Sequence, residues 1–265
     1  MSQNFDYILP LDRPEIARMV FYPRPDPGFP VQNGEDLMVS VADGVRVGVR
    51  LYLAENSKPN ILFFHGNGEI AADYEDIGPV YNRYEMNFFV ADYRGYGKSN
   101  GTPSAVALLQ DAHAVYRGVQ EWMENKGCTG PLFIMGRSLG SASALELASS
   151  YPGEIRGLIL ESAFAETLPL LQLLGIDPDR LGVTEENGFG NARKIQQYSK
   201  PTLIIHARND HIIPFRQAEI LMEKSPARGK QLVVVPGANH NDILYVAGEE
   251  YFRTIHYFVK RYARK

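Results

Sequence analysis

A serine flanked by glycines lies in the segment Gly136-Arg-Ser138-Leu-Gly140. The apolar run from Leu132 to Met135 predicts a buried strand before it, and the small residues that follow predict a helix close to a sheet. Gly-x-Ser-x-Gly on a strand–turn–helix is the pattern of a nucleophile elbow, in which a strained backbone projects the serine hydroxyl from the sheet edge. We therefore predict that Ser138 is a nucleophile. A Cβ at either glycine would collide with the neighbouring strand or helix.

A serine nucleophile needs a base within hydrogen-bonding reach and an acid that orients the base. Asp210 and His240 each follow an apolar run, so both are expected at the carboxyl edge of a sheet, where open α/β sheets bind their ligands. The chain order Ser138, Asp210, His240 is the order of an α/β hydrolase. We predict a triad of these residues. Asp242 is a second candidate acid, but its position before the last helix favours a capping role.

A glycine-rich loop, His65-Gly66-Asn67-Gly68-Glu69, follows another apolar run. Its glycines allow backbone N–H groups to approach a substrate oxygen. We predict an oxyanion hole made by the N–H groups of Asn67 and Leu139, with the N–H of Gly66 as the alternative donor.

The same loop supports a different enzyme class. Gly66-x-Gly68-x-x-Ala71, with Asp92 at the end of the next strand, resembles a dinucleotide-binding fingerprint. That hypothesis leaves the positions of the serine, aspartate and histidine unexplained. A non-catalytic binding protein that keeps the fold without the chemistry is the third alternative.

Composition limits the partners. With 27 basic and 31 acidic residues the net charge is −4, which gives no electrostatic case for nucleic acid, so we expect a small-molecule substrate. His206, His211 and His240 lack a supporting ligand spacing, and Cys128 is the only cysteine, so we predict neither a metal nor a cofactor.

No apolar run approaches the roughly 18 residues of a membrane span. The first thirty residues lack the basic start and apolar core of a secretory signal. We expect a cytoplasmic protein. Its oligomeric state is left open.

The alternating pattern from Asp36 to Ala54 around Asp43-Gly44 predicts an antiparallel hairpin. Helical segments separate most of the apolar runs after it, and one of these helices is expected to start with Thr102 as its N-cap and Pro103 at its first position. This alternation predicts an α/β fold: a mostly parallel, twisted sheet of about eight strands with helices on both faces. The apolar runs are Ile61–Phe64, Phe88–Ala91, Leu132–Met135, Leu158–Leu160, Leu203–Ile205 and Leu232–Val235.

We expect a single domain over residues 1–265. Residues 164–198 do not fit the alternation, because glycines and prolines interrupt a leucine-rich stretch there. An apolar insertion between two core strands predicts a short lid or cap over a hydrophobic pocket. Its leucines are Leu168, Leu170, Leu171, Leu173 and Leu174.

Five segments together resemble the α/β-hydrolase superfamily over nearly the whole chain, in the branch of depalmitoylase-like and serine-aminopeptidase-like hydrolases. They are His65–Gly68, Asp92–Ser99, Gly136–Gly140, Glu161–Phe164 and Gly237–Asp242. The resemblance implies the superfamily and not a substrate. With the predicted triad it favours a serine hydrolase of carboxylic esters or thioesters, with amide cleavage on the same triad as the alternative, and the short insertion predicts small to medium acyl groups. The depalmitoylases carry a cysteine-rich N-terminal anchor, whereas Cys128 is the only cysteine of this sequence, so depalmitoylation is not predicted for this chain.

Overall fold

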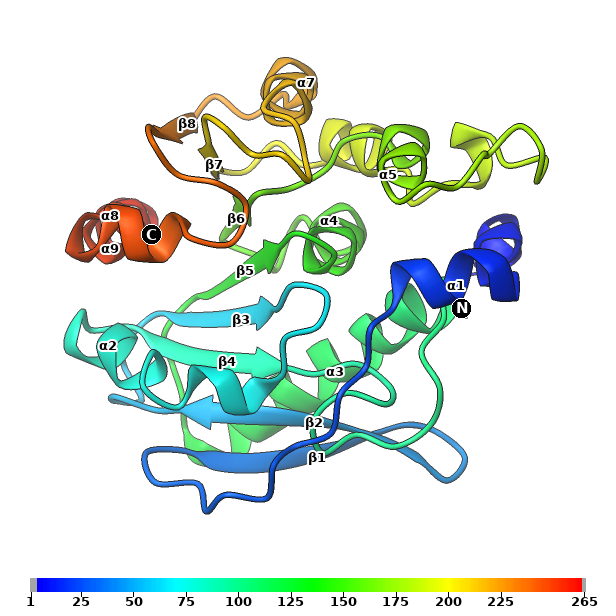
Figure 1. Ribbon diagram of the computed structural model, residues 1–265. Helices are drawn as coiled ribbons and strands as arrows, with labels where there is room; N and C mark the ends of the chain where they lie inside the picture. The colour runs from blue at the N-terminus through cyan, green and yellow to red at the C-terminus, as the bar shows by residue number, and fades with distance from the viewer. Residues whose placement is uncertain (1–3, 264–265) are drawn as a thin grey trace.

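The computed structural model describes residues 4–263, with eight strands in one sheet (Figure 1). The strand order is β1-β2-β4-β3-β5-β6-β7-β8. The hairpin strands β1 and β2 are antiparallel, β2 pairs antiparallel with β4, and all later pairs are parallel. The strands are β1 Glu35–Ala42, β2 Val45–Tyr52, β3 Asn60–Phe64, β4 Asn87–Ala91, β5 Leu132–Arg137, β6 Gly157–Glu161, β7 Thr202–Ala207 and β8 Lys230–Val235.

Helices cover both faces of the sheet. The α-helices are α1 Pro14–Val20, α2 Gly78–Arg83, α3 Ala105–Lys126, α4 Gly140–Ser150, α5 Thr167–Leu173, α6 Asn191–Lys194, α7 Arg216–Lys224, α8 Ile243–Ala247 and α9 Glu249–Ala263. The short 3-10 helices are η1 Asp6–Asp12, η2 Ala71–Tyr74, η3 Glu185–Asn187 and η4 Ile195–Gln197. None of the helices within residues 4–263 combines the length and apolarity that crossing a bilayer requires.

Alternate side chains of each central strand enter two separate cores. On β3, Leu62 and Phe64 pack with α3 and α4, whereas Ile61 and Phe63 pack on the other face with α2 and α9. This two-residue period explains why the central strands are continuous apolar runs: both of their faces are buried. The predicted fold class and the predicted hairpin are confirmed.

The parallel strands β3, β4 and β5 all end toward the side of the molecule that carries α1 and α5 (Figure 1). Loops that follow these strands therefore meet at one edge of the sheet, which is where the predicted site residues must gather.

The structure corrects one predicted helix start and divides one predicted helix. Helix α3 begins at Ala105 because the Ser104 hydroxyl, rather than Thr102, accepts the N–H of Ala107 at 3.0 Å. The terminal helix is two helices, since Gly248 adopts φ +54 and separates α8 from α9.

The insertion at residues 164–198 is tied to the body by polar contacts at its first turn. Gln217 on α7 accepts the N–H groups of Ala165 and Glu166 at 2.8 and 2.9 Å. Within the insertion, Glu185 accepts the N–H groups of Thr167 and Leu168. The insertion also buries apolar side chains in the core, namely Leu171, Ile176, Val183, Phe189, Ile195 and Tyr198.

Candidate active site

Ser138 lies in the tight turn between β5 and α4. Its φ is +50, in the left-handed region that costs a residue with a Cβ free energy, and its N–H donates to the carbonyl of Glu161 at 2.9 Å. A Cβ on Gly136 would lie 2.4 Å from the carbonyl oxygen of Gly140, and one on Gly140 would lie 2.0 Å from that of Phe64. Both glycines are therefore required by close backbone approach, as predicted.

The structure brings the predicted serine, histidine and aspartate into one hydrogen-bonded chain. The ring nitrogen Nε2 of His240 lies 3.0 Å from Ser138 Oγ, and Nδ1 lies 2.8 Å from Asp210 Oδ2. All three side chains are buried. They come from the loops after β5, β7 and β8, although 102 residues separate Ser138 from His240 in the sequence.

Asp210 is held as an acceptor. Its Oδ1 accepts the N–H groups of Ile212 and Ile213 at 3.0 and 2.7 Å, which leaves Oδ2 to face the imidazole. Burial alone would raise the pKa of Asp210, but the hydrogen bond and charge of His240 and the N–H of Ile213 lower it below the ordinary value. Asp210 is thus an ionised group facing Nδ1.

The second candidate acid, Asp242, lies in the loop that carries His240. Asp242 accepts the backbone N–H of Asn239 at 2.6 Å and stands at the N-cap position of α8. Its side chain makes no cap hydrogen bond to the helix. Asp242 therefore shapes the turn that carries His240 and does not orient its ring.

The predicted oxyanion donors face different constraints. The N–H of Gly66, the alternative donor, is occupied, because it donates to Glu69 Oε2 at 2.8 Å. The N–H groups of Asn67 and Leu139 donate to no protein acceptor within residues 4–263. The side chain of Asn67 is fixed, because its Oδ1 accepts the N–H of Tyr22 at 2.8 Å and the hydroxyl of Tyr96 at 2.7 Å.

The residues of the dinucleotide hypothesis have internal partners. Asp92 is buried, and its Oδ1 lies 3.1 Å from His65 Nε2 and accepts the N–H of Ala71 at 2.8 Å. A ribose hydroxyl that bonded to Oδ1 would have to compete with both contacts. Across residues 4–263 no three His, Cys, Asp or Glu side chains form a group that could hold a metal ion.

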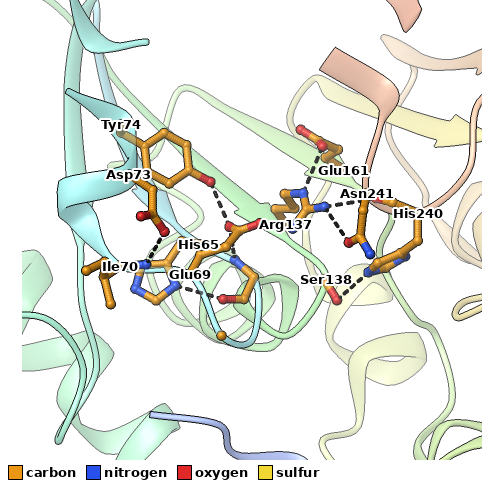
Figure 2. Close-up of polar contacts among 12 residues, drawn as sticks. His65, Glu69, Ile70, Asp73, Tyr74, Arg137, Ser138, Glu161, His240 and Asn241 are labelled. Carbon is orange, nitrogen blue, oxygen red and sulfur yellow. Dashed lines mark hydrogen bonds and ion pairs between the residues drawn. The ribbon is translucent and has the colours of Figure 1, made fainter. Parts of the chain in front are cut away.

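Sequence reasoning missed a charged network beside the triad. Arg137, the residue before the serine, contacts Glu69, Glu161, His240 and Asn241 (Figure 2). Burial disfavours its charge, but the two carboxylates outweigh this effect and raise the pKa of Arg137. Burial likewise favours the neutral form of Glu69, but Arg137 holds the pKa of Glu69 below its ordinary value. The only sequence signal was an arginine and two glutamates near strand ends.

Known proteins resemble the chain in sequence. A family model described as serine aminopeptidase, S33, matches residues 55–175. The α/β hydrolase domain-containing protein WAV2 of Arabidopsis thaliana is 28% identical over 247 residues, which cover 86% of this chain and 79% of that protein. The α/β hydrolase domain-containing protein 17C of Mus musculus is 32% identical over 197 residues, which cover 72% of this chain and 57% of that protein.

Solved structures resemble the chain in fold. The esterase Pf2001 of Pyrococcus furiosus superimposes with a TM-score of 0.74 at 18% identity, covering 92% of this chain and 100% of the esterase. A monoglyceride lipase of Saccharomyces cerevisiae gives a TM-score of 0.68 at 21% identity, covering 90% of this chain and 98% of the lipase. At these identities the likeness establishes a shared fold.

Proposed function

Because this chain belongs to the α/β-hydrolase superfamily, we propose that it is a serine hydrolase that cleaves carboxylic esters or thioesters through an acyl-enzyme. The observation that carries the proposal is the continuous hydrogen-bonded chain from Ser138 Oγ through His240 to Asp210.

In the proposed reaction, Ser138 Oγ attacks the substrate carbonyl while Nε2 of His240 takes the hydroxyl proton. The N–H groups of Leu139 and Asn67 stabilise the oxyanion of the tetrahedral intermediate. The intermediate collapses, His240 gives its proton to the departing alcohol or thiol, and an acyl-serine ester remains. Water then attacks this ester with His240 again as the base, which releases the acid and restores Ser138.

Asp210 acts on the base throughout this cycle. Its carboxylate fixes the proton of His240 on Nδ1, so that Nε2 presents a lone pair to the serine, and it stabilises the imidazolium that forms. No step requires a cofactor.

We propose that the insertion at residues 164–198 bounds the acyl site and limits it to small or medium chains. A small hollow lies between α5 and the loop after Asp210, lined by six apolar residues and by the polar Glu166 and Gln217; the apolar residues are Phe164, Pro169, Leu170, Ile212, Ile213 and Pro214. Leu170 is only partly buried, whereas Leu171 is fully buried in the core. Leu170 is therefore the leucine assigned to substrate.

Amide cleavage is the second candidate, since the matching family model is described as serine aminopeptidase. A panel of nitrophenyl esters, acyl-CoA thioesters and aminoacyl anilides separates the two. We expect hydrolysis of the esters and thioesters to exceed that of the anilides.

The decisive experiment is labelling with a fluorophosphonate and hydrolysis of p-nitrophenyl butyrate by Ser138→Ala. We expect this variant to fold, to escape labelling and to lose at least ~10³-fold in kcat. Ser143→Ala is the matched control, because Ser143 is a buried serine on α4 whose hydroxyl donates to the carbonyl of Leu108. Near-full activity in Ser138→Ala would refute the proposal.

A further inference from the structure

Three separate segments must keep fixed relative positions in the proposed reaction: the loop at residues 65–69, the serine turn, and the loop that carries His240. Arg137 contacts all three (Figure 2). It precedes the serine, its Nη1 pairs with Glu69 Oε1, and its Nη2 donates to the carbonyl oxygen of His240 at 2.9 Å. One planar guanidinium therefore spans the candidate site.

Glu69 extends this contact to the oxyanion loop. Its second oxygen, Oε2, accepts the N–H of Gly66 at 2.8 Å and the hydroxyl of Tyr74 at 2.7 Å. The bond from Gly66 fixes the His65–Gly66 peptide unit, and the backbone N–H of Glu69 donates to the carbonyl of Gly66 at 3.2 Å, which fixes the next unit, the one that carries the N–H of Asn67. The N–H of Asn67, one residue further on, is thereby oriented by a carboxylate that Arg137 holds in place.

The remaining edge of the guanidinium is anchored in the sheet. Its Nε lies 3.1 Å from Glu161 Oε1, at the end of β6, and the carbonyl of the same residue accepts the N–H of Ser138 at 2.9 Å. The hydroxyl of Tyr251 donates to the other oxygen of Glu161. Glu161 therefore supports the serine turn through its backbone and Arg137 through its side chain.

Only a guanidinium matches this arrangement. Arg137 uses Nε, Nη1 and Nη2 for partners that lie in different directions, and its side chain is only 11% exposed. A lysine ammonium at this position carries the charge at a single point and lacks the planar fork. Distances within the site depend on such supports, since a displacement of about 1 Å can cost ~10²-fold in rate.

We propose that Arg137 and Glu69 are positioning residues that set the oxyanion N–H of Asn67 and the loop of His240 relative to Ser138. The inference rests on the proposed function, because it assigns these residues to a serine mechanism. Both act through the backbone, Glu69 through the N–H of Gly66 and Arg137 through the carbonyl of His240.

The test compares Arg137→Lys, Arg137→Met and Glu69→Gln by steady-state hydrolysis of p-nitrophenyl butyrate. We expect Arg137→Met to lower kcat about 10²-fold with KM changed less than about threefold, because binding groups stay while the transition-state donors shift. Arg137→Lys and Glu69→Gln should give smaller losses of kcat. The fluorophosphonate labelling rate of Ser138 should fall in parallel with kcat.

Arg94→Met is the matched control. Arg94 makes a two-point ion pair with Asp111 at 2.6 and 2.7 Å, at the start of the loop after β4, and this pair is not hydrogen-bonded to any triad residue. Removing it costs a partly buried ion pair of similar kind. We expect the kcat of this control to stay within about threefold of the unmodified protein.

A double-mutant cycle tests whether Arg137 and Glu69 act as one device. The variant carrying both Glu69→Gln and Arg137→Met should be no slower than Arg137→Met alone. If Arg137→Met does not fold, the milder Arg137→Lys and Glu69→Gln carry the same comparison of kcat with KM.

The inference is overturned if folded Arg137 and Glu69 variants lose no more kcat than Arg94→Met, or if their effects in the cycle simply multiply. These results leave the proposed function standing when Ser138→Ala is inactive. An active Ser138→Ala would instead overturn the serine mechanism itself.

Discussion

The two candidate acids can be separated by matched amide substitutions, Asp210→Asn and Asp242→Asn. In Asp210→Asn the side-chain oxygen can still accept the N–H groups of Ile212 and Ile213. The amide NH₂ then faces Nδ1 of His240, where Oδ2 now lies at 2.8 Å. Two donors cannot share this contact. The ring must expose its lone pair at Nδ1 and carry its proton on Nε2, so it cannot accept the serine proton.

The expected loss is on the order of 10⁴ in kcat, the effect of a wrong histidine tautomer in a serine triad. Asp242→Asn keeps an oxygen for the N–H of Asn239, which Asp242 now accepts at 2.6 Å. We expect its kcat to fall by less than about threefold and its stability to fall by about 1 kcal/mol at most, the scale of a lost turn or cap contact.

Acid stability gives an independent check on Asp210. Its folded-state pKa lies below the ordinary value of 3.8, so ionised Asp210 stabilises the fold above that value, and this contribution is lost as the pH falls through the folded-state pKa. Asp210→Asn should therefore show a smaller loss of stability between pH 5 and pH 2 than the unmodified protein.

Hydrolysis of p-nitrophenyl butyrate at pH 8 and urea denaturation across the acid range measure both effects. Equal inactivation by the two substitutions, or an Asp210→Asn variant within about tenfold of the unmodified kcat, would refute the assignment of the acid.

Two further predictions concern the supporting structure. The pKa of Glu146 is lowered from 4.5 to about 2 by contacts with His113 and Lys194 that outweigh its burial, so Glu146 should contribute about 3 kcal/mol to the stability lost in urea denaturation as the pH falls from 5 to 2, and Glu146→Gln should lower that loss by about this amount. Gly140→Ala should destabilise the fold by about 3 kcal/mol or more, because its Cβ would meet the backbone of Phe64, whereas a Cβ on Gly153 meets nothing within 4 Å, so Gly153→Ala should change the urea midpoint little. Equal midpoints for these two alanine variants would contradict the close-approach argument.

The fold was predictable because both faces of the central strands are buried, which makes each strand a continuous apolar run such as Ile61–Phe64. The site was predictable where local geometry restricts residue type. The turn at Ser138 needs glycines at 136 and 140, and strand ends place Asp210 and His240 at one edge.

The missed features depend on contacts between distant segments. Arg137 and Glu69 are 68 residues apart and meet only because β3 and β5 are neighbours in the sheet. An arginine or glutamate on its own has no pattern that distinguishes this role from an exposed surface position. The start of α3 was misplaced for a local reason, since Thr102 and Ser104 are both good N-caps and the structure uses the second.

The strand order places Ser138 and His240 in regions of unequal local stability. Ser138 follows β5, which has a strand on each side, whereas His240 follows β8, the last strand of the sheet, most of which is only partly buried. Segments with few buried apolar contacts open at lower free energy than core strands. Heat inactivation should therefore begin below the temperature at which the protein melts, while the serine turn is still intact. The activity retained on heating or storage would then depend on how stably β8 pairs with β7. Substitutions meant to preserve activity should start at that strand.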